Sequence, residues 1–456
     1  MFDVHVTNTS VSFCSERNRV PLKFGHEITT LFSICRVCCM VENNSGITCQ
    51  GVGETPVAVA WTWPSSLSYK ARETRMIEFI NLLCDEWKHF EKIGHPMEIG
   101  YRFILERLHP LLNKANMMHS DEEKMPYLAA LVCNASFDIA LFDAYSTLNG
   151  IKAFDCFNSK YMNHDLSWYY EGEDASDFIG KYPEEFMVPR DEVPDKLIVW
   201  HLVGGTDPIS EDELTGKEPD DGYPVILRDW IKRDGLKCLK IKLRGNDEPW
   251  DYDRIVRVGE IAVETGVEHL TADFNCTVHE ADYVCRILDK LKSEHKNLFD
   301  MILYIEQPFP YDMGKNPIDV HAVSERKLLM MDESAHDWHY VKLGINLGWT
   351  GVALKTCKTI TGAVLMLCYA RHHGMKIMVQ DLTNPKLAII PHVLLAANAG
   401  TIMGVEANSM QFCPEASHDE ARIHPGLFRR RNGYLDLSSI GNTGFGYRLD
   451  EIEDAR

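Results

Sequence analysis

The chain has 456 residues, too many for one ordinary hydrophobic core, so we expect two structural units. Hydrophobic residues make up 45% of it and charged residues 25%, as in a globular protein with a packed interior. The net charge of −20 argues against a nucleic-acid partner, because nothing offsets repulsion from the phosphate backbone.

The N-terminal sequence MFDVHVTNTS has neither the basic region nor the apolar run of a secretory leader. We therefore expect the 14 cysteines to be reduced, mostly buried thiols of a cytoplasmic protein. Cys35 and Cys38 have the spacing of metal ligands, but strand alternation would point them to opposite faces, so no zinc site is expected. No apolar run approaches the roughly 20 residues that span a membrane, so no membrane partner is expected.

The first part of the chain predicts an α+β unit. Residues 1–60 alternate apolar runs with turn signals, as in a small antiparallel sheet. Three helical patterns follow, at about 76–87, 97–118 and 126–150. The last of them stops at Asn149-Gly150, a typical C-terminal signal.

Residues 158–196 interrupt the regular pattern. This stretch is acidic, rich in aromatic residues and punctuated by proline. We interpret it as an irregular insertion. Because its aromatic residues can bury apolar area, we expect it to cover or flank the mouth of the following domain rather than form a free linker.

From residue 197 onward the chain repeats a short apolar strand, a polar loop and a helical stretch. The candidate strands are 197–203, 236–243, 267–274, 301–307, 327–333, 351–355, 375–380 and 401–406. Eight strands at this spacing predict a closed parallel α/β barrel. A doubly wound open sheet is the alternative, and it is disfavoured because no Gly-x-Gly-x-x-Gly follows any strand.

Ionisable residues stand at the ends of five of these strands, where barrel enzymes carry their functional groups. They are Lys240 and Lys242, Asp273, Glu306, Asp332 with Glu333, and Lys355. Buried carboxylates repel one another unless a cation lies among them. Three oxygen ligands on adjacent strands predict a hard-cation site such as Mg²⁺.

Lys242 and Lys355 lie on strands that flank the three carboxylate-bearing strands. That order places one amine on each face of a substrate held at the cation. A lysine close to a metal ion and to Lys240 should have a depressed pKa, as a general base requires. Lys358 is the competing candidate on the same strand, and we expect it in the following loop, where its replacement would cost little.

Several motifs resemble the enolase superfamily, in its mandelate racemase and muconate lactonising enzyme branch. They are KIK at 240–242, ADFN at 272–275, IEQPF at 305–309, MDES at 331–334 and ALKTCKTITGA at 353–363. The resemblance implies an α/β fold, a modified TIM barrel (β/α)7β with an N-terminal α+β capping domain. The implied boundaries are 1–157 for the capping domain, 158–196 for the insertion, 197–414 for the barrel and 415–456 for a C-terminal segment that returns to the cap.

Site roles implied by the resemblance follow the matching motifs. Asp273, Glu306 and Asp332 match the ligands of Mg²⁺, with Mn²⁺ as an alternative. Lys242 and Lys355 match two opposing general bases, and Lys240 matches the lysine that holds the substrate carboxylate or tunes its partner. The remaining matches are to side chains that support the ligands, Asn275 and Glu333.

The lysine on the sixth strand favours the muconate-cycloisomerase-like subgroup, because the racemase and sugar-acid dehydratase groups carry a His–Asp pair there and on the seventh strand. Glu406 resembles the glutamate of lactonising enzymes, whereas dipeptide epimerases often have Asp-x-Asp at that strand. From the cap, Phe24, His26, Trp61 and Trp63 match positions near the barrel mouth. They are expected to contact substrate, with ordinary packing the alternative for the tryptophans.

The resemblance thus implies a metal-dependent isomerase acting on a small-molecule carboxylate. It would remove the α-proton and stabilise the enolate, as a racemase, epimerase or cycloisomerase. A dehydratase using the same enolate is one alternative, and a catalytically inactive binding barrel is another. Many members of the family form homo-oligomers, so self-association is an open expectation.

Overall fold

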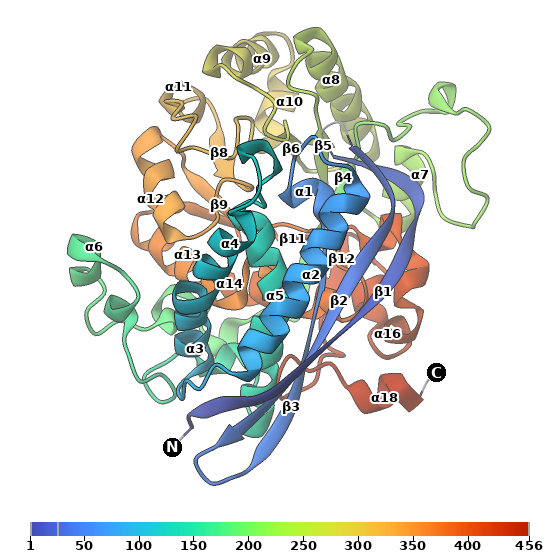
Figure 1. Cartoon of the computed structure of the whole chain (residues 1–456). Coiled ribbons are helices and arrows are strands. Elements are labelled where there is room, and N and C mark those ends of the chain that lie inside the picture. The colour runs from blue at the N-terminus through green and yellow to red at the C-terminus, as the bar shows by residue number, and fades with distance from the viewer. Residues whose placement is uncertain (1, 25–26, 455–456) are drawn as a thin grey trace.

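The computed structural model, which describes residues 2–24 and 27–454, consists of an N-terminal cap seated on a barrel (Figure 1). The cap sheet is antiparallel, in the order β1 (Val4–Phe24), β2 (Glu27–Asn43), β3 (Thr48–Pro56). The cap helices are α1 (Val59–Thr62), α2 (Tyr69–Lys88), α3 (Pro96–Phe103), α4 (His109–Asn116) and α5 (Tyr127–Leu148), with a π-helical turn at Ile104–Leu108. The predicted sheet and the three helical regions are thus present.

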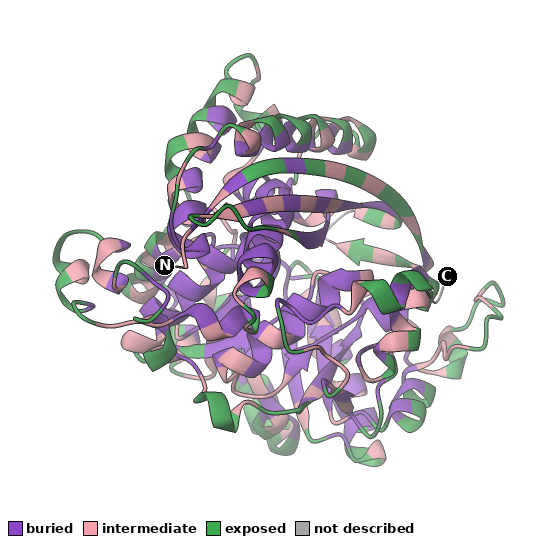
Figure 2. Cartoon of the chain, turned by 90° about the horizontal axis from the view of Figure 1, so that it is seen from below, coloured by how far each residue is buried: buried purple, intermediate pink, exposed green. Residues whose placement is uncertain are grey.

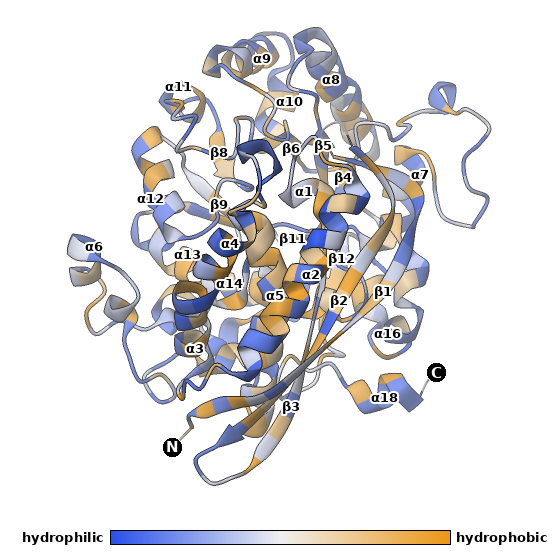
Figure 3. Cartoon of the chain, viewed as in Figure 1, coloured by the Kyte–Doolittle hydropathy of each residue, from blue (hydrophilic) through white to orange (hydrophobic). Residues whose placement is uncertain are grey.

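Helix α5 is the central helix of the cap and is buried along most of its length. The stretch Asp121–Leu148 is long and apolar enough to cross a membrane, contrary to our expectation that no run would be, but 89% of its apolar window is buried inside the protein. Strand β3 approaches the helix very closely, because a Cβ on Gly53 would lie 2.1 Å from the carbonyl oxygen of Ser136. This packing is that of a core helix, and Figure 3 shows hydrophobic residues along it.

The second domain is a nearly closed parallel barrel of eight strands. In sequence they are β4 (Lys196–Val203), β5 (Cys238–Lys242), β6 (His269–Asp273), β7 (Ile302–Glu306), β8 (Leu328–Met331), β9 (Gly351–Leu354), β10 (Lys376–Val379) and β11 (Val405–Glu406). The order runs from β10 through β9 down to β4 and then to β11. Ile402 N–H donates to the Ile377 carbonyl (2.9 Å) across the remaining gap. The predicted parallel barrel is confirmed as a nearly closed one, and each strand lies within its predicted range except β4, which begins one residue earlier.

Helices cover the outside of the barrel. They are α7 (Leu227–Asp234), α8 (Glu248–Thr265), α9 (Ala281–Glu294), α10 (Lys296–Met301), α11 (His321–Ser324), α12 (Trp338–Leu347), α13 (Ile360–His372) and α14 (Ile389–Ala399). The chain after β11 adds α15 (Ser409–Phe412), α16 (His418–Ile423), α17 (Pro425–Phe428), β12 (Tyr434–Asp436), which pairs with β4, and α18 (Leu449–Asp454). Figure 2 shows buried residues through the interior and exposed ones on the outer helices.

Two aspartates of α5 connect the cap to the rest of the chain. Asp138 accepts hydrogen bonds from Thr361 N (3.0 Å) and Thr361 Oγ1 (2.7 Å) at the start of α13. Asp143 accepts from Val52 N (2.9 Å) in β3 and from Phe445 N (2.9 Å) in the C-terminal segment. The same helix therefore holds the cap sheet, the barrel and the chain's last turn-rich segment in place.

The segment 158–196, which includes α6 (Gly172–Ser176), packs on the outer face of α12 and α13. Tyr170 donates to the Leu365 carbonyl (2.8 Å), and Val188 N–H donates to the Asn398 carbonyl (2.8 Å). We expected this segment to cover or flank the barrel mouth, but none of its residues lines the cavity there, although the structure describes all of them. Tyr170 and Phe178 pack against Trp338 and Tyr369 of the barrel helices α12 and α13. Trp168 and Tyr169 pack against Tyr101 of the cap helix α3.

Candidate active site

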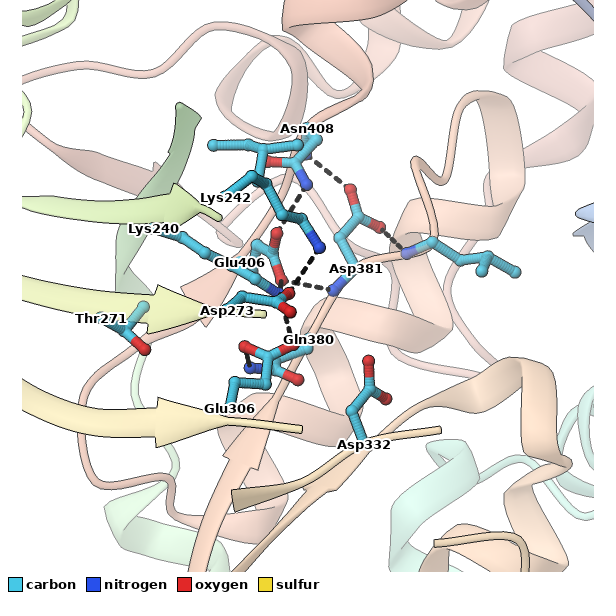
Figure 4. A network of polar contacts seen from close by, with 12 residues as sticks. Lys240, Lys242, Thr271, Asp273, Glu306, Asp332, Gln380, Asp381, Glu406 and Asn408 are labelled. Carbon is cyan, nitrogen blue, oxygen red and sulfur yellow. Dashed lines mark hydrogen bonds and ion pairs between the residues drawn. The ribbon is translucent and has the colours of Figure 1, made fainter. Parts of the chain in front are cut away.

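Ionisable side chains from five neighbouring strands meet at one end of the barrel, and Figure 4 shows those of the first four, β5 to β8. They are Lys240, Lys242, Asp273, Glu306, Asp332 and Lys355, all at or directly after the C-terminal ends of β5 to β9. The parallel register places Lys242 beside Asp273, and Asp273 beside Glu306. The six barrel residues singled out in the sequence therefore lie together.

Lys240 is the centre of an ion-pair network. Its Nζ lies 2.6 Å from Glu306 Oε1, 3.1 Å from Asp273 Oδ2 and 3.2 Å from Glu406 Oε2. Burial opposes the charge of Lys240, but Glu306 and Glu406 outweigh it and raise the pKa well above the usual value. Lys240 therefore stays protonated and holds the carboxylates together instead of acting as a base.

The carboxylates of Asp273 and Glu306 are neighbours, and their pKa values move in opposite directions. Burial and the Asp273 charge raise the pKa of Glu306 well above its usual range. At Asp273, burial is outweighed by Lys242 and Lys240, which hold the pKa below its usual range. Asn275 N–H also donates to Asp273 Oδ1 (2.8 Å). Two carboxylates this close need a proton or a cation between them.

Asp332 is contacted by two lysines. Lys355 Nζ lies 3.0 Å from its Oδ2, and Lys358 Nζ lies 3.5 Å from its Oδ1. Lys358 also donates to the Asp332 carbonyl (2.5 Å) and is fully buried. We expected Lys358 to be a dispensable loop residue. It does follow the strand, in a 3₁₀ turn at Thr356–Lys358, but this turn directs its side chain inward.

The surroundings of Lys355 raise its pKa. Burial opposes the charge, but the Asp332 carboxylate outweighs burial. Because Asp332 is an expected metal ligand, a cation bound there would weaken this effect and move the pKa down. Lys355 can therefore act as a base only if a cation bound at Asp332 offsets the negative charge of that carboxylate.

Two glutamines, to which the sequence analysis gave no role, position the carboxylates. Gln307 Oε1 accepts hydrogen bonds from Asp332 N (2.8 Å), Ser334 N (3.2 Å) and Ser334 Oγ (2.8 Å), and so fixes the turn after β8. Gln380, directly after β10, donates from Nε2 to Glu306 Oε2. Their positions directly after β7 and β10 could have identified them in the sequence, because side chains there lie at the same end of the barrel as the carboxylates.

The residues of the site fit a hard divalent cation, although no group of three or more His, Cys, Asp and Glu among residues 2–24 and 27–454 has metal-binding geometry. Lysine amines take up that space, with Lys240 between Asp273 and Glu306. The buried donors are carboxylate oxygens, and Asp332 Oδ1 and Glu333 Oε2 lack hydrogen-bond partners. Carboxylate oxygens are the ligands that Mg²⁺ prefers, so Asp273, Glu306 and Asp332 would hold it.

The cap reaches the site through Trp61 on α1. Its Nε1–H donates to Glu333 Oε1 (2.9 Å), and its ring centroid lies 4.7 Å from Lys355 Nζ. Ala58, just before α1, has a φ of 48°, a left-handed conformation that costs a non-glycine residue about 1–2 kcal/mol. The hydrogen bond from Trp61 means that the cap holds Glu333, which was expected to support the metal ligands. Burial and the charge of Asp332 raise its pKa to about 7.

A cavity lies between the cap and the strand ends. Its lining shows which of the residues expected to contact substrate reach it. Phe24, Trp61 and Glu406 line it, together with Lys240, Lys242, Asp332 and Lys355. Trp63 does not line it. Trp63 lies at the C-terminal end of α1, the short helix that carries Trp61. Its ring is fully buried in the cap and packs against Arg75. His26 lies outside the described residues.

Comparisons with known proteins agree with this architecture. Residues 226–453 match the family model described as Enolase C-terminal domain-like. Among solved structures, a dipeptide epimerase from Enterococcus faecalis complexed with Mg and the dipeptide L-Leu-L-Tyr is 15% identical (TM-score 0.61, covering 97% of this chain and 99% of that one). An N-succinyl Arg/Lys racemase from Bacillus cereus is 16% identical (0.61, 99% and 98%). A muconate lactonizing enzyme from Pseudomonas fluorescens complexed with muconolactone is 13% identical (0.56, 97% and 96%). A search of curated proteins found no match.

Proposed function

Because this chain belongs to the enolase superfamily, in its mandelate racemase and muconate lactonizing enzyme family, we propose that it is a Mg²⁺-dependent enzyme that removes the proton next to a substrate carboxylate. The enolate formed in this way is stabilised and then reprotonated or rearranged. The net reaction we propose is racemisation, epimerisation or cycloisomerisation, as in the muconate-cycloisomerase-like subgroup.

The observation that carries this proposal is the pair of lysines on either side of the carboxylates. Lys242 lies on β5 and Lys355 follows β9, and β6, β7 and β8 separate these strands in the sheet order. Both lysines line the same cavity. Their amines therefore approach a bound molecule from different sides of the barrel.

In a racemisation or epimerisation, one of these two amines accepts the α-proton on its Nζ, and the other donates a proton to the opposite face. In a cycloisomerisation, one amine transfers the proton and the other adds positive charge beside the enolate. Lys240, protonated among Glu306, Asp273 and Glu406, keeps the carboxylate cluster in place. Mg²⁺ held by Asp273, Glu306 and Asp332 would supply positive charge where the negative charge of the enolate develops. Trp61 covers Lys355 and restricts access of water from the cap side.

A solvent-exchange screen tests the proposal. The full chain with Mg²⁺ is incubated in D₂O with N-acyl amino acids, dipeptides, lactones and sugar acids, and mass spectrometry scores the uptake of one deuterium at the α-carbon. We expect exchange for at least one class, abolished in a Lys242→Ala/Lys355→Ala double variant. Absence of exchange in every class would refute the proposal, and loss of water from a sugar acid would identify a dehydratase.

A further inference from the structure

A second cavity lies between the cap and the barrel, apart from the one above the strand ends. Helices α3 and α5, the π-helical turn and the first turns of α12 and α13 form its walls. About 50 Å³ of it is open to the centres of water molecules, which is room for several waters or for one small ligand. No described residue lines both cavities, so the proposed reaction does not use this one.

Two buried side chains in the wall of this second cavity have unmet hydrogen-bonding groups. His336 is 4% exposed and Trp338 is 3% exposed. Within residues 2–24 and 27–454, Trp338 Nε1–H has no hydrogen-bond partner. His336 makes a weak contact with the Glu333 backbone, but neither ring nitrogen has a partner of good hydrogen-bond geometry in that part of the chain. Buried polar groups in folded proteins are normally paired, so these two side chains indicate a missing partner.

The unmet groups comprise a donor and an acceptor. The indole N–H of Trp338 can only donate a hydrogen bond. Burial and the nearby charge of Lys358 lower the pKa of His336 to about 4, so its ring is neutral near pH 7 and has one donating and one accepting nitrogen. The contact with the Glu333 backbone opposes this lowering of the pKa, as a carbonyl acceptor does, and so involves the donating nitrogen. A molecule that fits both side chains must therefore accept one hydrogen bond and donate another.

The lysine and the aspartate that line this cavity already have partners in the protein. Lys358 donates to the Asp332 carbonyl (2.5 Å) and lies 3.5 Å from Asp332 Oδ1. Asp337 is the N-cap of α12, and its Oδ1 accepts from His339 N (2.9 Å) and Tyr340 N (3.4 Å). An anion bound here would face Asp337, and a cation would face Lys358. Burying either charge without a free partner costs free energy, so the site favours an uncharged ligand.

We propose that this second cavity binds a small uncharged molecule that both accepts and donates hydrogen bonds, of the primary-amide kind. Its carbonyl oxygen accepts from Trp338 Nε1–H, and its N–H donates to the accepting nitrogen of His336. Its short apolar part lies against Ile104 and Leu131, which also line the cavity. Ile104 belongs to the π-helical turn, a feature that often marks functional sites. The site is independent of the reaction proposed above.

Three molecules of similar size test the ligand class: propionamide, propionate and propylammonium, which are uncharged, anionic and cationic. Equilibrium dialysis against the full wild-type chain, in a buffer with a metal chelator, gives the affinity of each. We expect propionamide to bind with a dissociation constant of roughly 1–10 mM, as its few non-hydrogen atoms allow, and both ions to bind at least tenfold more weakly. Equal or tighter binding of either ion would overturn the class. No saturable binding of propionamide would show that only water fills the cavity.

The indole N–H signals of the nine tryptophans locate the bound molecule. The full chain is labelled with ¹⁵N-tryptophan, and the signal that is missing from Trp338→Phe assigns Trp338. Propionamide should shift this signal saturably, with the dissociation constant found by dialysis. The signal of Trp61, which lines the first cavity, should stay in place. If the Trp61 signal shifts and the Trp338 signal does not, the amide binds in the first cavity and the assignment is wrong.

Replacing His336 by phenylalanine tests its part in binding, because the change keeps an aromatic ring and removes both nitrogens. Propionamide should bind at least fivefold more weakly to His336→Phe. His321→Phe is the matched control, since the side chain of His321 is 58% exposed and lies outside the cavity, and its affinity should equal that of the wild type. Thermal unfolding of each variant checks that it is folded, and the wild-type dialysis decides the ligand class without any variant. Unchanged affinity in a folded His336→Phe would contradict the site.

Discussion

Replacing Lys358 by methionine should destabilise the protein substantially, because its buried charge is paired with Asp332. The substitution keeps an apolar stem of similar length and removes the amine that donates to the Asp332 carbonyl at 2.5 Å and lies 3.5 Å from Oδ1. Removing one partner of a buried ion pair costs about 3–5 kcal/mol. That cost applies when the remaining charge has no partner. Lys355 still contacts Asp332 at 3.0 Å, so we expect a smaller loss, about 1–3 kcal/mol, because the Asp332 carbonyl loses its buried donor.

The assay is urea unfolding of the wild type and of Lys358→Met, in a buffer containing a metal chelator. Lys296→Met is the matched control, because Lys296 also forms an ion pair at 2.5 Å, with Asp300, but is largely exposed. An exposed pair contributes about 0–1 kcal/mol. Added Mg²⁺ should reduce the loss in Lys358→Met, since it would supply positive charge to the same carboxylate. A loss below about 0.5 kcal/mol in chelator, the range of surface substitutions, would refute the reasoning.

Two further predictions concern the metal and pH. Glu306→Gln should lower Mg²⁺ affinity at least tenfold by isothermal titration calorimetry, because it removes a ligand charge, and an unchanged dissociation constant would contradict the assignment. Burial lowers the pKa of His95, the N-cap of α3, to about 3. Below about pH 6.5 the unfolded chain binds a proton at this histidine and the folded protein does not, so the free energy of unfolding falls as pH falls from 6.5 toward 3. His95→Asn, which keeps a capping acceptor, should reduce the slope of unfolding free energy between pH 6 and 5 by about 1.4 kcal/mol per pH unit, and an unchanged slope would show that His95 is not responsible.

The barrel and its strand-end residues could be predicted because they depend on local patterns. A short apolar strand that ends in an ionisable residue, as at Asp273 and Glu306, defines both the strand and the barrel end at which that side chain lies. Register between parallel strands then brings such residues together, since the strands align at their C-terminal ends.

The features that were missed depend on contacts between distant segments. Gln307 and Gln380 resemble ordinary loop residues until their hydrogen bonds to Asp332 and Glu306 are seen. Trp61 and Trp63 are equivalent in the sequence, but Trp61 lines the cavity and Trp63 is buried in the cap core. Tertiary packing decides which of these side chains contact the site, and periodicity and composition carry no information on it.

Single-lysine variants test the central claim, which is that Lys242 and Lys355 act on opposite faces of one substrate. Each enantiomer of a compound that exchanges with the wild type is incubated in D₂O with Lys242→Ala or with Lys355→Ala, and deuterium at the α-carbon is measured over time. We predict that each variant loses net turnover, and that each still exchanges one enantiomer, the opposite one in the two variants. If both variants exchange the same enantiomer, or if either retains full turnover, the two-base account is contradicted.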